Sequence, residues 1–463
     1  MAEQITAKST EIMLPHSKTP PGPRGHFLLG SAPEMQRDAP AFLLRLNRQY
    51  GDIVRMRFAF WPTYVVYHPE DIKHILQTNH KNYNNKDFFV YKMLRPLFGM
   101  GLITNDGQSW LHQRRLIQPA FHRKRVAALG TQMTTLTVTM LKHWQDFAEC
   151  NQPLDIAAEM YTLTLCIAGK TLFGIDFSGG ASDFERAFLR LNRLWAQYFY
   201  APFPPISVPI PRNRRLQEAI RILNGIVDDI INERRQQQID KGDLLSMLLM
   251  ARDEETGQGM SAQQVHDEVV TMLNAGHETV ATALTWTLYL LSQHPEVERR
   301  FYEELDAVLG GNLPTIEHLS RLSYTQMVFE EALRLYPSAW LIGRKAIAED
   351  QLRGYRIPAN SIILLSPYCT HRHPAFWENP EVFDPDRFAP ERSADRPSYA
   401  YFPFAGGPRL CIGNMYALME AKLVLAAIGQ RYRLQLAPNH LVEYEALLNI
   451  RPRYGMKMTL EPR

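Results

Sequence analysis

Apolar side chains recur at helical spacing through the middle of the chain. Positions i, i+3 and i+4 are apolar in five segments, which span 129–147, 153–172, 181–197, 214–237 and 261–293. This spacing places the apolar residues of each segment on one face, and it predicts five helices. The longest begins with Ser261 and Gln264, the pattern of a capping box. We therefore expect helices to dominate up to about residue 336.

Strand-like patterns flank this helical region. Residues 52–58 and 63–69 predict a pair of strands, with Trp61 and Pro62 in the turn between them. Short β-like runs follow at 355–357 and 361–365, before a proline-rich irregular stretch over 374–410. One more helix is expected at about 412–430, and then a strand-like tail. The fold class is thus mainly α with a small β subdomain.

The chain has the organisation of one large domain. Residues 1–25 are polar and then proline-rich, and they predict a flexible arm before a single domain over 26–463. No Gly/Ser linker or internal repeat divides the chain. The aromatic and proline-rich segment 198–211 interrupts the helices, because proline is excluded from helix interiors. It is either a buried connector or a mobile lid, and its length favours the lid.

Composition and charge exclude several classes of protein. The 463 residues are 45% hydrophobic and 21% charged, which is typical of globular proteins. Because 51 basic residues balance 48 acidic ones, nothing indicates nucleic acid as a partner. No apolar run reaches the ~18 residues of a membrane span, so we expect a cytoplasmic protein without a transmembrane anchor, although peripheral membrane contact stays open. The four cysteines show no CxxC pair and no zinc-ligand spacing.

One cysteine lies in an unusual setting, at the end of the glycine-rich segment 402–413. Cys411 falls where this loop passes into the predicted helix, and the unpaired N–H groups of a helix start stabilise a thiolate. Phe404 can cover the sulfur, and Arg409 can hold a nearby anion. The loop can bend tightly because it contains Gly406, Gly407 and Gly413.

A thiolate in such a loop has three interpretations. It can be a nucleophile, which would need a histidine base, but no cysteine-enzyme signature accompanies His371 and His373. It can be inert. It can also be the axial ligand of a haem iron, with Arg409 paired to a propionate, and this interpretation fits the loop best.

The same segment resembles the haem-binding signature of the cytochrome P-450 family. The matching residues are Phe404, Gly407, Arg409, Cys411 and Gly413. Ala405 stands where the family usually has Gly or Ser, and we expect only a minor effect from so small a side chain. The resemblance implies the cytochrome P-450 fold of a soluble, bacterial-type protein, with heme b as cofactor and Cys411 as the ligand of the iron.

Three further motifs occur in the family's order. Glu331 and Arg334 match the ExxR motif, and with Arg387 they resemble the family's buried structural triad. Trp110 and Arg114 match the WxxxR motif, whose side chains bind a propionate in the family. The third propionate partner implied by the resemblance is Arg344.

The fourth motif, with Gly276, Glu278 and Thr279, lies in the middle of the longest helix. One interpretation is a threonine bonded back to its own helix beside a solvent-facing glutamate. The other is a local widening of the helix, with Glu278 and Thr279 handling protons. These residues resemble the family's acid–alcohol motif for oxygen activation, although Val280 replaces a second hydroxyl residue.

The resemblance implies a monooxygenase that inserts one oxygen atom of O2 into a lipophilic molecule. By position, the substrate pocket includes Phe88, Phe89, Leu97, Leu273, Ala275, Ala339, Trp340, Leu341, Ile342 and Leu447. Because most of these residues are apolar, we expect a fatty acid, a terpenoid or a steroid-like compound. Rival functions are a peroxide-driven peroxygenase, a haem-dependent isomerase and a non-catalytic haem sensor, and the intact acid–alcohol pair disfavours all three.

Electrons are expected from a separate partner, because no flavin or iron–sulfur motif occurs. Residues 122–125 (His-Arg-Lys-Arg), with Arg114 and Arg115 nearby, form a basic cluster on the expected cysteine side. This cluster is either a solvated turn or a docking site for an acidic ferredoxin or flavodoxin, which would work with its own reductase. We expect the protein to be a monomer.

Overall fold

The structure is a computed structural model that describes residues 18–84, 86–177, 183–200, 204–252 and 257–463. Its first helices are α1 (Ala32–Tyr50), α2 (Pro69–Lys73), α3 (Phe89–Phe98), α4 (Gly107–Ile117), α5 (Arg123–Ala128), α6 (Gly130–Glu149), α7 (Ile156–Phe173) and α8 (Asp183–Tyr200). The later helices are α9 (Pro211–Gln237), α10 (Leu244–Met250), α11 (Ala262–Gln293), α12 (Pro295–Leu309), α13 (Ser323–Leu335), α14 (Pro367–Thr370), α15 (Pro390–Ser393) and α16 (Asn414–Gly429). The expected mainly helical class is confirmed.

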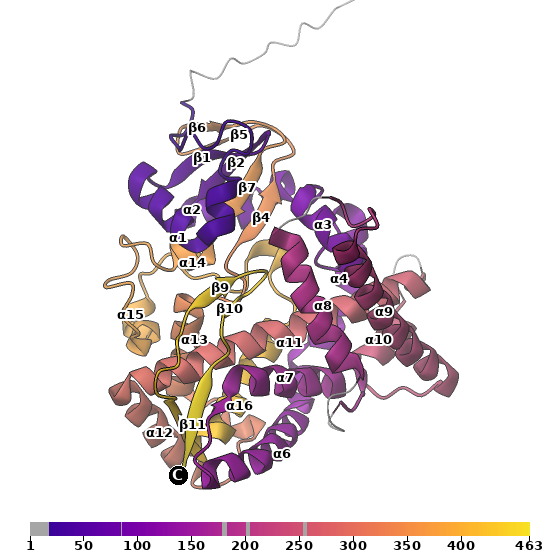
Figure 1. The fold of residues 1–463 in the computed structure, drawn as a ribbon, viewed down its shortest axis with the longest axis vertical. Coiled ribbons are helices and arrows are strands. Elements are labelled where there is room, and N and C mark those ends of the chain that lie inside the picture. The colour runs from indigo at the N-terminus through magenta and orange to yellow at the C-terminus, as the bar shows by residue number, and fades with distance from the viewer. Residues whose placement is uncertain (1–17, 85, 178–182, 201–203, 253–256) are drawn as a thin grey trace, which may run out of the picture.

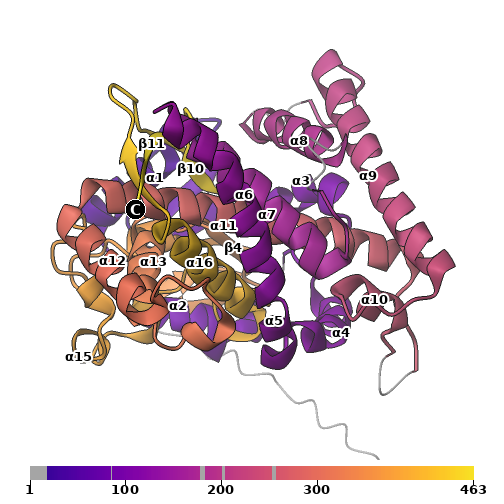
Figure 2. The same cartoon turned by 90° about the horizontal axis from the view of Figure 1, so that it is seen from below.

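Helix α11 runs through the middle of the helical region (Figure 1, Figure 2). It packs against α7, α9, α13 and α16, and it is buried along most of its length. The predicted capping box is confirmed, because the Ser261 hydroxyl accepts the Gln264 N–H at 3.2 Å and the Gln264 side chain accepts the Ser261 N–H at 2.8 Å. Helix α11 therefore provides the central support to which the other site-bearing elements attach.

In the described part of the chain, the strands form one sheet of four and three smaller sheets. Their bounds are β1 (Ile53–Phe58), β2 (Trp61–Val66), β3 (Leu154–Asp155), β4 (Ile342–Lys345), β5 (Asp350–Leu352), β6 (Tyr355–Ile357), β7 (Ile362–Leu365), β8 (Tyr432–Leu436), β9 (Tyr444–Ala446), β10 (Ile450–Pro452) and β11 (Lys457–Pro462). The larger sheet has the order β1-β2-β7-β4, with β2 and β7 parallel and the other pairs antiparallel. With α1 it makes up the end of the molecule away from α6 and α12 (Figure 1).

The turn between β1 and β2 differs from the sequence expectation. Trp61 and Pro62 lie in β2, where Trp61 pairs with Phe58. The turn is Ala59 and Phe60, and Ala59 has a positive φ of 49°. The physical reason is that the Trp61 ring stacks on Phe89, with ring centroids 5.3 Å apart, which holds Trp61 in the strand.

The interruption of the helices begins later than the expected segment 198–211, because α8 continues to Tyr200. Residues 201–203 lie outside the described residues. The described remainder is bonded to α9: the Asn213 amide donates to the carbonyls of Pro205 (2.8 Å) and Val208 (3.0 Å), and Gln217 donates to Ile206 at 2.8 Å. These bonds are those of a fixed connector, and a lid function stays a prediction.

One described helix, α7, is long and apolar enough to cross a bilayer by length and composition, and 61% of that span is buried. It packs against α6 and α11 in the main core. Such burial is typical of the core helix of a globular protein.

Candidate active site

Cys411 lies between a short turn of 3₁₀ helix (Gly407–Arg409) and the start of α16. Its N–H donates to the Phe404 carbonyl at 3.0 Å, which closes the loop. Gly407 has a φ of +63°, and a Cβ there would lie 1.8 Å from the Leu76 carbonyl oxygen, so only glycine fits. Ala405 has a φ of 61°. The departure at this position thus costs about 1 kcal/mol of backbone strain, which the small size of alanine does not avoid.

The Cys411 sulfur is influenced by its surroundings in two directions. Burial raises the pKa of its thiol, whereas the Gly413 N–H and the positive charge of Arg114 act to lower it. Cys411 nevertheless has accessible surface. The sulfur is thus surrounded by protein atoms and still has surface that a ligand could contact. The described residues contain no cluster of three or more His, Cys, Asp or Glu side chains that could hold a metal ion by themselves.

Four cationic side chains gather next to this loop. The Arg409 guanidinium lies 4.1 Å from the centre of the Trp110 ring and donates to the Asn105 carbonyl at 3.0 Å. Burial and the charges of Arg344 and Arg114 lower the pKa of Arg409 to about 9. Arg344 is itself buried in β4, and burial lowers its pKa.

Lys86 is the fourth cation, and the sequence motifs did not identify it. Its ammonium donates to the Ile103 carbonyl at 2.7 Å, and burial together with Arg409 and Arg344 lowers its pKa well below the usual range. Within the described residues, none of the four cations has an ion pair with a carboxylate. The charge of Asp106 acts on Lys86 and Arg409 but offsets only part of this positive charge. Buried cations without a paired counter-ion are costly, so this cluster fits a bound group that carries carboxylates, as the two propionates of haem do.

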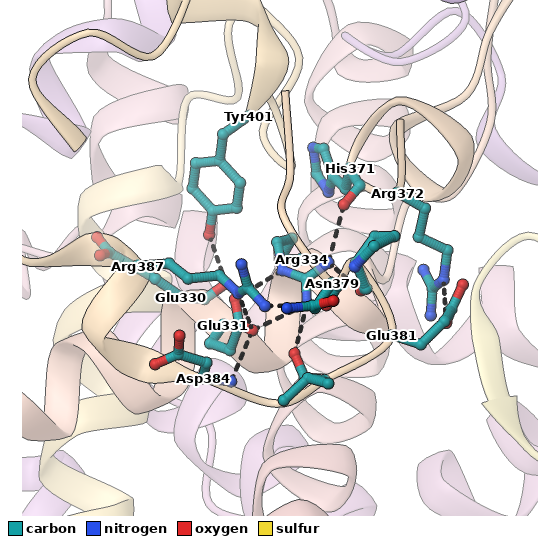
Figure 3. A network of polar contacts seen from close by, with 12 residues as sticks. Glu330, Glu331, Arg334, His371, Arg372, Asn379, Glu381, Asp384, Arg387 and Tyr401 are labelled. Atoms are coloured by element: carbon teal, nitrogen blue, oxygen red, sulfur yellow. Dashed lines mark hydrogen bonds and ion pairs between the residues drawn. The ribbon is translucent and has the colours of Figure 1, made fainter. Parts of the chain in front are cut away.

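The three residues of the expected triad meet in the core (Figure 3). Arg334 donates to both oxygens of Glu331 at 2.7 and 2.8 Å, and Arg387 donates to Glu331 at 3.3 Å. Arg334 also donates to the backbone carbonyls of His371, Pro380 and Val382. The triad therefore fixes the irregular chain that precedes the cysteine loop.

Both histidines considered as bases for Cys411 have other partners. The His371 Nε2 accepts the Phe402 N–H at 3.0 Å, and burial beside Arg334 holds the pKa of this imidazole well below its usual range. His373 pairs with Asp52 at 2.9 Å. This placement leaves the nucleophile interpretation of Cys411 without its base.

The motif of α11 adopts ordinary α-helix, and no local widening is present. The Thr279 hydroxyl donates to the Ala275 carbonyl at 2.8 Å, as in the back-bonded interpretation. Glu278 does not face solvent: it is buried, and it accepts a hydrogen bond from the Tyr161 hydroxyl at 3.0 Å. Gly276 faces α7, where a Cβ would lie at an ordinary 3.6 Å from Leu172.

Tyr161 is a second residue that sequence reasoning missed. Burial and the adjacent Glu278 raise the pKa of its hydroxyl well above the usual range, so the hydroxyl stays protonated and donates. It lies on α7, 117 positions from Glu278, and no local motif marks it.

The expected pocket residues fall into several groups. Phe88 and Trp340 lie in one buried cluster with Leu341, and Trp340 donates to the Leu447 carbonyl at 2.9 Å. Ile342 packs into a different cluster, because alternate residues of β4 point to opposite faces. Phe89 stacks on Trp61 toward the outer surface. The remaining residues are Leu97 and Leu273, both in the main core, and the half-buried Ala275 and Ala339.

The basic cluster lies beside the cysteine loop. Residues 122–125 are exposed at the start of α5, and α5 contacts α16. Arg114 is half-buried among the four cations, so it does not belong to this surface. The cluster is therefore smaller than the sequence indicated.

Comparisons with known proteins give concordant results. The family model "Cytochrome P450" matches residues 20–458. Cyclooctatin synthase of Streptomyces melanosporofaciens is 38% identical, over 95% of this chain and 93% of its own. Pentalenene oxygenase of Streptomyces avermitilis is 35% identical, over 91% and 93%. The solved heme domain of cytochrome P450DA superposes with a TM-score of 0.88 at 29% identity, and the match covers 96% of this chain and 98% of that one.

Proposed function

The chain belongs to the cytochrome P450 family of monooxygenases, and we propose that it inserts one oxygen atom of O2 into a terpenoid. The support for this substrate class comes from two similar proteins that are named for terpenoids, cyclooctatin synthase and pentalenene oxygenase. Each match covers more than nine-tenths of the chain. A largely apolar set of expected pocket residues agrees with a hydrocarbon substrate. Fatty acids, which the sequence left level with terpenoids, become the less favoured class.

The residues present fit haem. Cys411 would ligate the iron, and the carboxylates of the cofactor would meet the cations Arg409, Arg344, Lys86 and Arg114. The Trp110 ring already holds the Arg409 guanidinium in place. When bound, haem supplies the binding and activation of O2, and an axial thiolate favours O–O cleavage.

The chain's own residues would manage protons. The Thr279 hydroxyl donates a hydrogen bond to the Ala275 carbonyl, so its oxygen lone pairs can accept another hydrogen bond. Glu278 precedes it on the same helix, and Tyr161 holds its carboxylate. Proton transfer between such groups is general acid–base catalysis, which contributes ~10²–10⁴-fold in rate.

Electron supply would come from a separate ferredoxin or flavodoxin with its reductase. The exposed residues 122–125 lie on the cysteine side, and their positive charge would steer an acidic partner. Exchanging Arg123 and Lys124 for glutamate is expected to slow reduction at low salt, with little difference at high salt. A monomer in the cytoplasm is the simplest state in which such a partner could reach this face.

The decisive experiment uses the haem-loaded protein with a surrogate ferredoxin, its reductase, NADPH and ¹⁸O2. Cyclic terpenes and fatty acids are supplied in parallel, and product is analysed for the label. We expect labelled terpene alcohols from the wild type, whereas Thr279→Ala should consume NADPH but release mainly peroxide. Labelled fatty acids alone would refute the substrate class. Equal coupling in Thr279→Ala would refute its proton role, and turnover with peroxide alone would favour a peroxygenase.

A further inference from the structure

Five large apolar side chains are exposed on two adjoining turns at the sheet end of the molecule. Phe27 is 76% exposed and Phe60 is 80% exposed, and Leu28, Leu29 and Trp61 are each about half exposed. The two segments are joined, because the Ala59 N–H donates to the Leu29 carbonyl at 3.0 Å. We call these five residues the apolar tip; it lies near the end of the β1–β2 hairpin (Figure 1).

The turn that carries Phe27, Leu28 and Leu29 is held in place by contacts with β1. Gly30 closes the turn 26–30, where a Cβ would come within 2.1 Å of the Arg57 carbonyl oxygen. The Arg57 guanidinium donates to the Phe27 carbonyl at 3.3 Å. Single exposed apolar residues are common on protein surfaces, whereas a contiguous group of this size usually marks an interaction site.

The charged side chains of the two segments that carry the apolar tip are all basic. Segments 18–30 and 53–66 contain Lys18, Arg24, Arg55 and Arg57 and no acidic residue. Arg24 and Arg55 are exposed. Apolar side chains on protruding turns next to cations are the combination that favours the interface of an anionic membrane, where the side chains enter the acyl boundary and the cations meet the phosphates.

We propose that the apolar tip docks this protein on the surface of an anionic lipid bilayer. The tip consists of two short turns that carry large exposed apolar side chains beside basic ones, and this combination favours a lipid surface. Aromatic contacts lead from the tip into the protein. The Trp61 ring stacks on the Phe89 ring, with centroids 5.3 Å apart, and the Phe89 and Phe88 ring centroids are 6.4 Å apart. Docking would thus bring Phe89, an expected pocket residue, close to the lipid, in which hydrocarbons dissolve. The proposal does not depend on the identity of the substrate.

Vesicle flotation of the haem-loaded protein tests this proposal. Vesicles of phosphatidylcholine with about a third phosphatidylglycerol are compared with phosphatidylcholine alone, at low and high salt. We expect the wild type to float with the anionic vesicles and to be released by salt. Phe27→Ser with Phe60→Ser should reduce the bound fraction at least about tenfold, and Arg24→Gln with Arg55→Gln should abolish the preference for anionic lipid.

The matched control is Leu441→Ser, which removes an exposed apolar side chain (58% exposed) outside the apolar tip. It should bind vesicles as the wild type does. A wild type that stays with the unbound fraction, or tip variants that float equally well, would overturn the proposal. So would a wild-type dimer in ultracentrifugation that Phe60→Ser dissociates, because the apolar tip would then be an interface between copies of this chain.

Discussion

Replacing Glu331 by glutamine tests the structural triad most sharply. Glu331 is fully buried, and its oxygens accept hydrogen bonds from Arg334, Arg387 and the Asp384 N–H. Glutamine keeps the shape but removes the negative charge, which leaves two buried guanidinium groups without a counter-ion. Breaking a buried ion pair from one side costs ~3–5 kcal/mol, so we expect that loss in the free energy of unfolding by urea.

The neighbouring Glu330 provides the control. It is half-buried, and its side chain accepts one hydrogen bond from Gln326 at 3.0 Å. Glu330→Gln should therefore cost no more than ~1 kcal/mol. Glu331→Gln should also lower haem retention, because the triad holds the chain that leads to the cysteine loop. A loss equal to that of the control, with haem fully retained, would show that Glu331 does not hold the two arginines in place.

Three further predictions concern proton handling, pH and glycine. Tyr161→Phe removes the donor that holds Glu278, so peroxide release per NADPH should rise several-fold while substrate affinity, from spectral titration, stays unchanged. Burial raises the pKa of Glu268 to about 8 from 4.5. Between these two pH values the folded protein therefore retains a proton that the unfolded chain releases. The free energy of unfolding should fall as the pH rises, by at most ~1.4 kcal/mol per pH unit. Glu268→Gln should remove this slope when unfolding by urea is measured across the pH range. Gly407→Ala should fail to accumulate as folded protein in solubility assays. Gly276→Ala has room for its Cβ, so its free energy of unfolding should equal that of the wild type or exceed it by ~1 kcal/mol.

Helices with a clean periodic pattern were predictable from the sequence. The expected segments 129–147 and 261–293 correspond to α6 (Gly130–Glu149) and α11 (Ala262–Gln293). Helix α1 was not anticipated, because Pro40 lies inside it and Asp38 has non-helical angles, so its local signals indicate a break. Packing against the sheet overrides those signals.

The site was predictable where its residues lie within short motifs. The loop that carries Cys411 and the Glu331–Arg334 pair are of this kind, because a helix or loop determines their geometry locally. Lys86 and Tyr161 were not predictable, since each joins the site through contacts between distant parts of the chain. Arg114 shows the same limit: the sequence placed it near the basic cluster as well as among the propionate partners, and its partial burial beside the cysteine loop is a tertiary effect.

Ligation of a haem iron by Cys411 can be read from the carbon monoxide spectrum of the reduced, haem-loaded protein. The wild type should give the absorption band of a thiolate-ligated haem. Cys411→Ser should lose that band while the protein keeps its fold by circular dichroism. A thiolate-type band that survives in Cys411→Ser, or one that never forms in the wild type, would contradict the account.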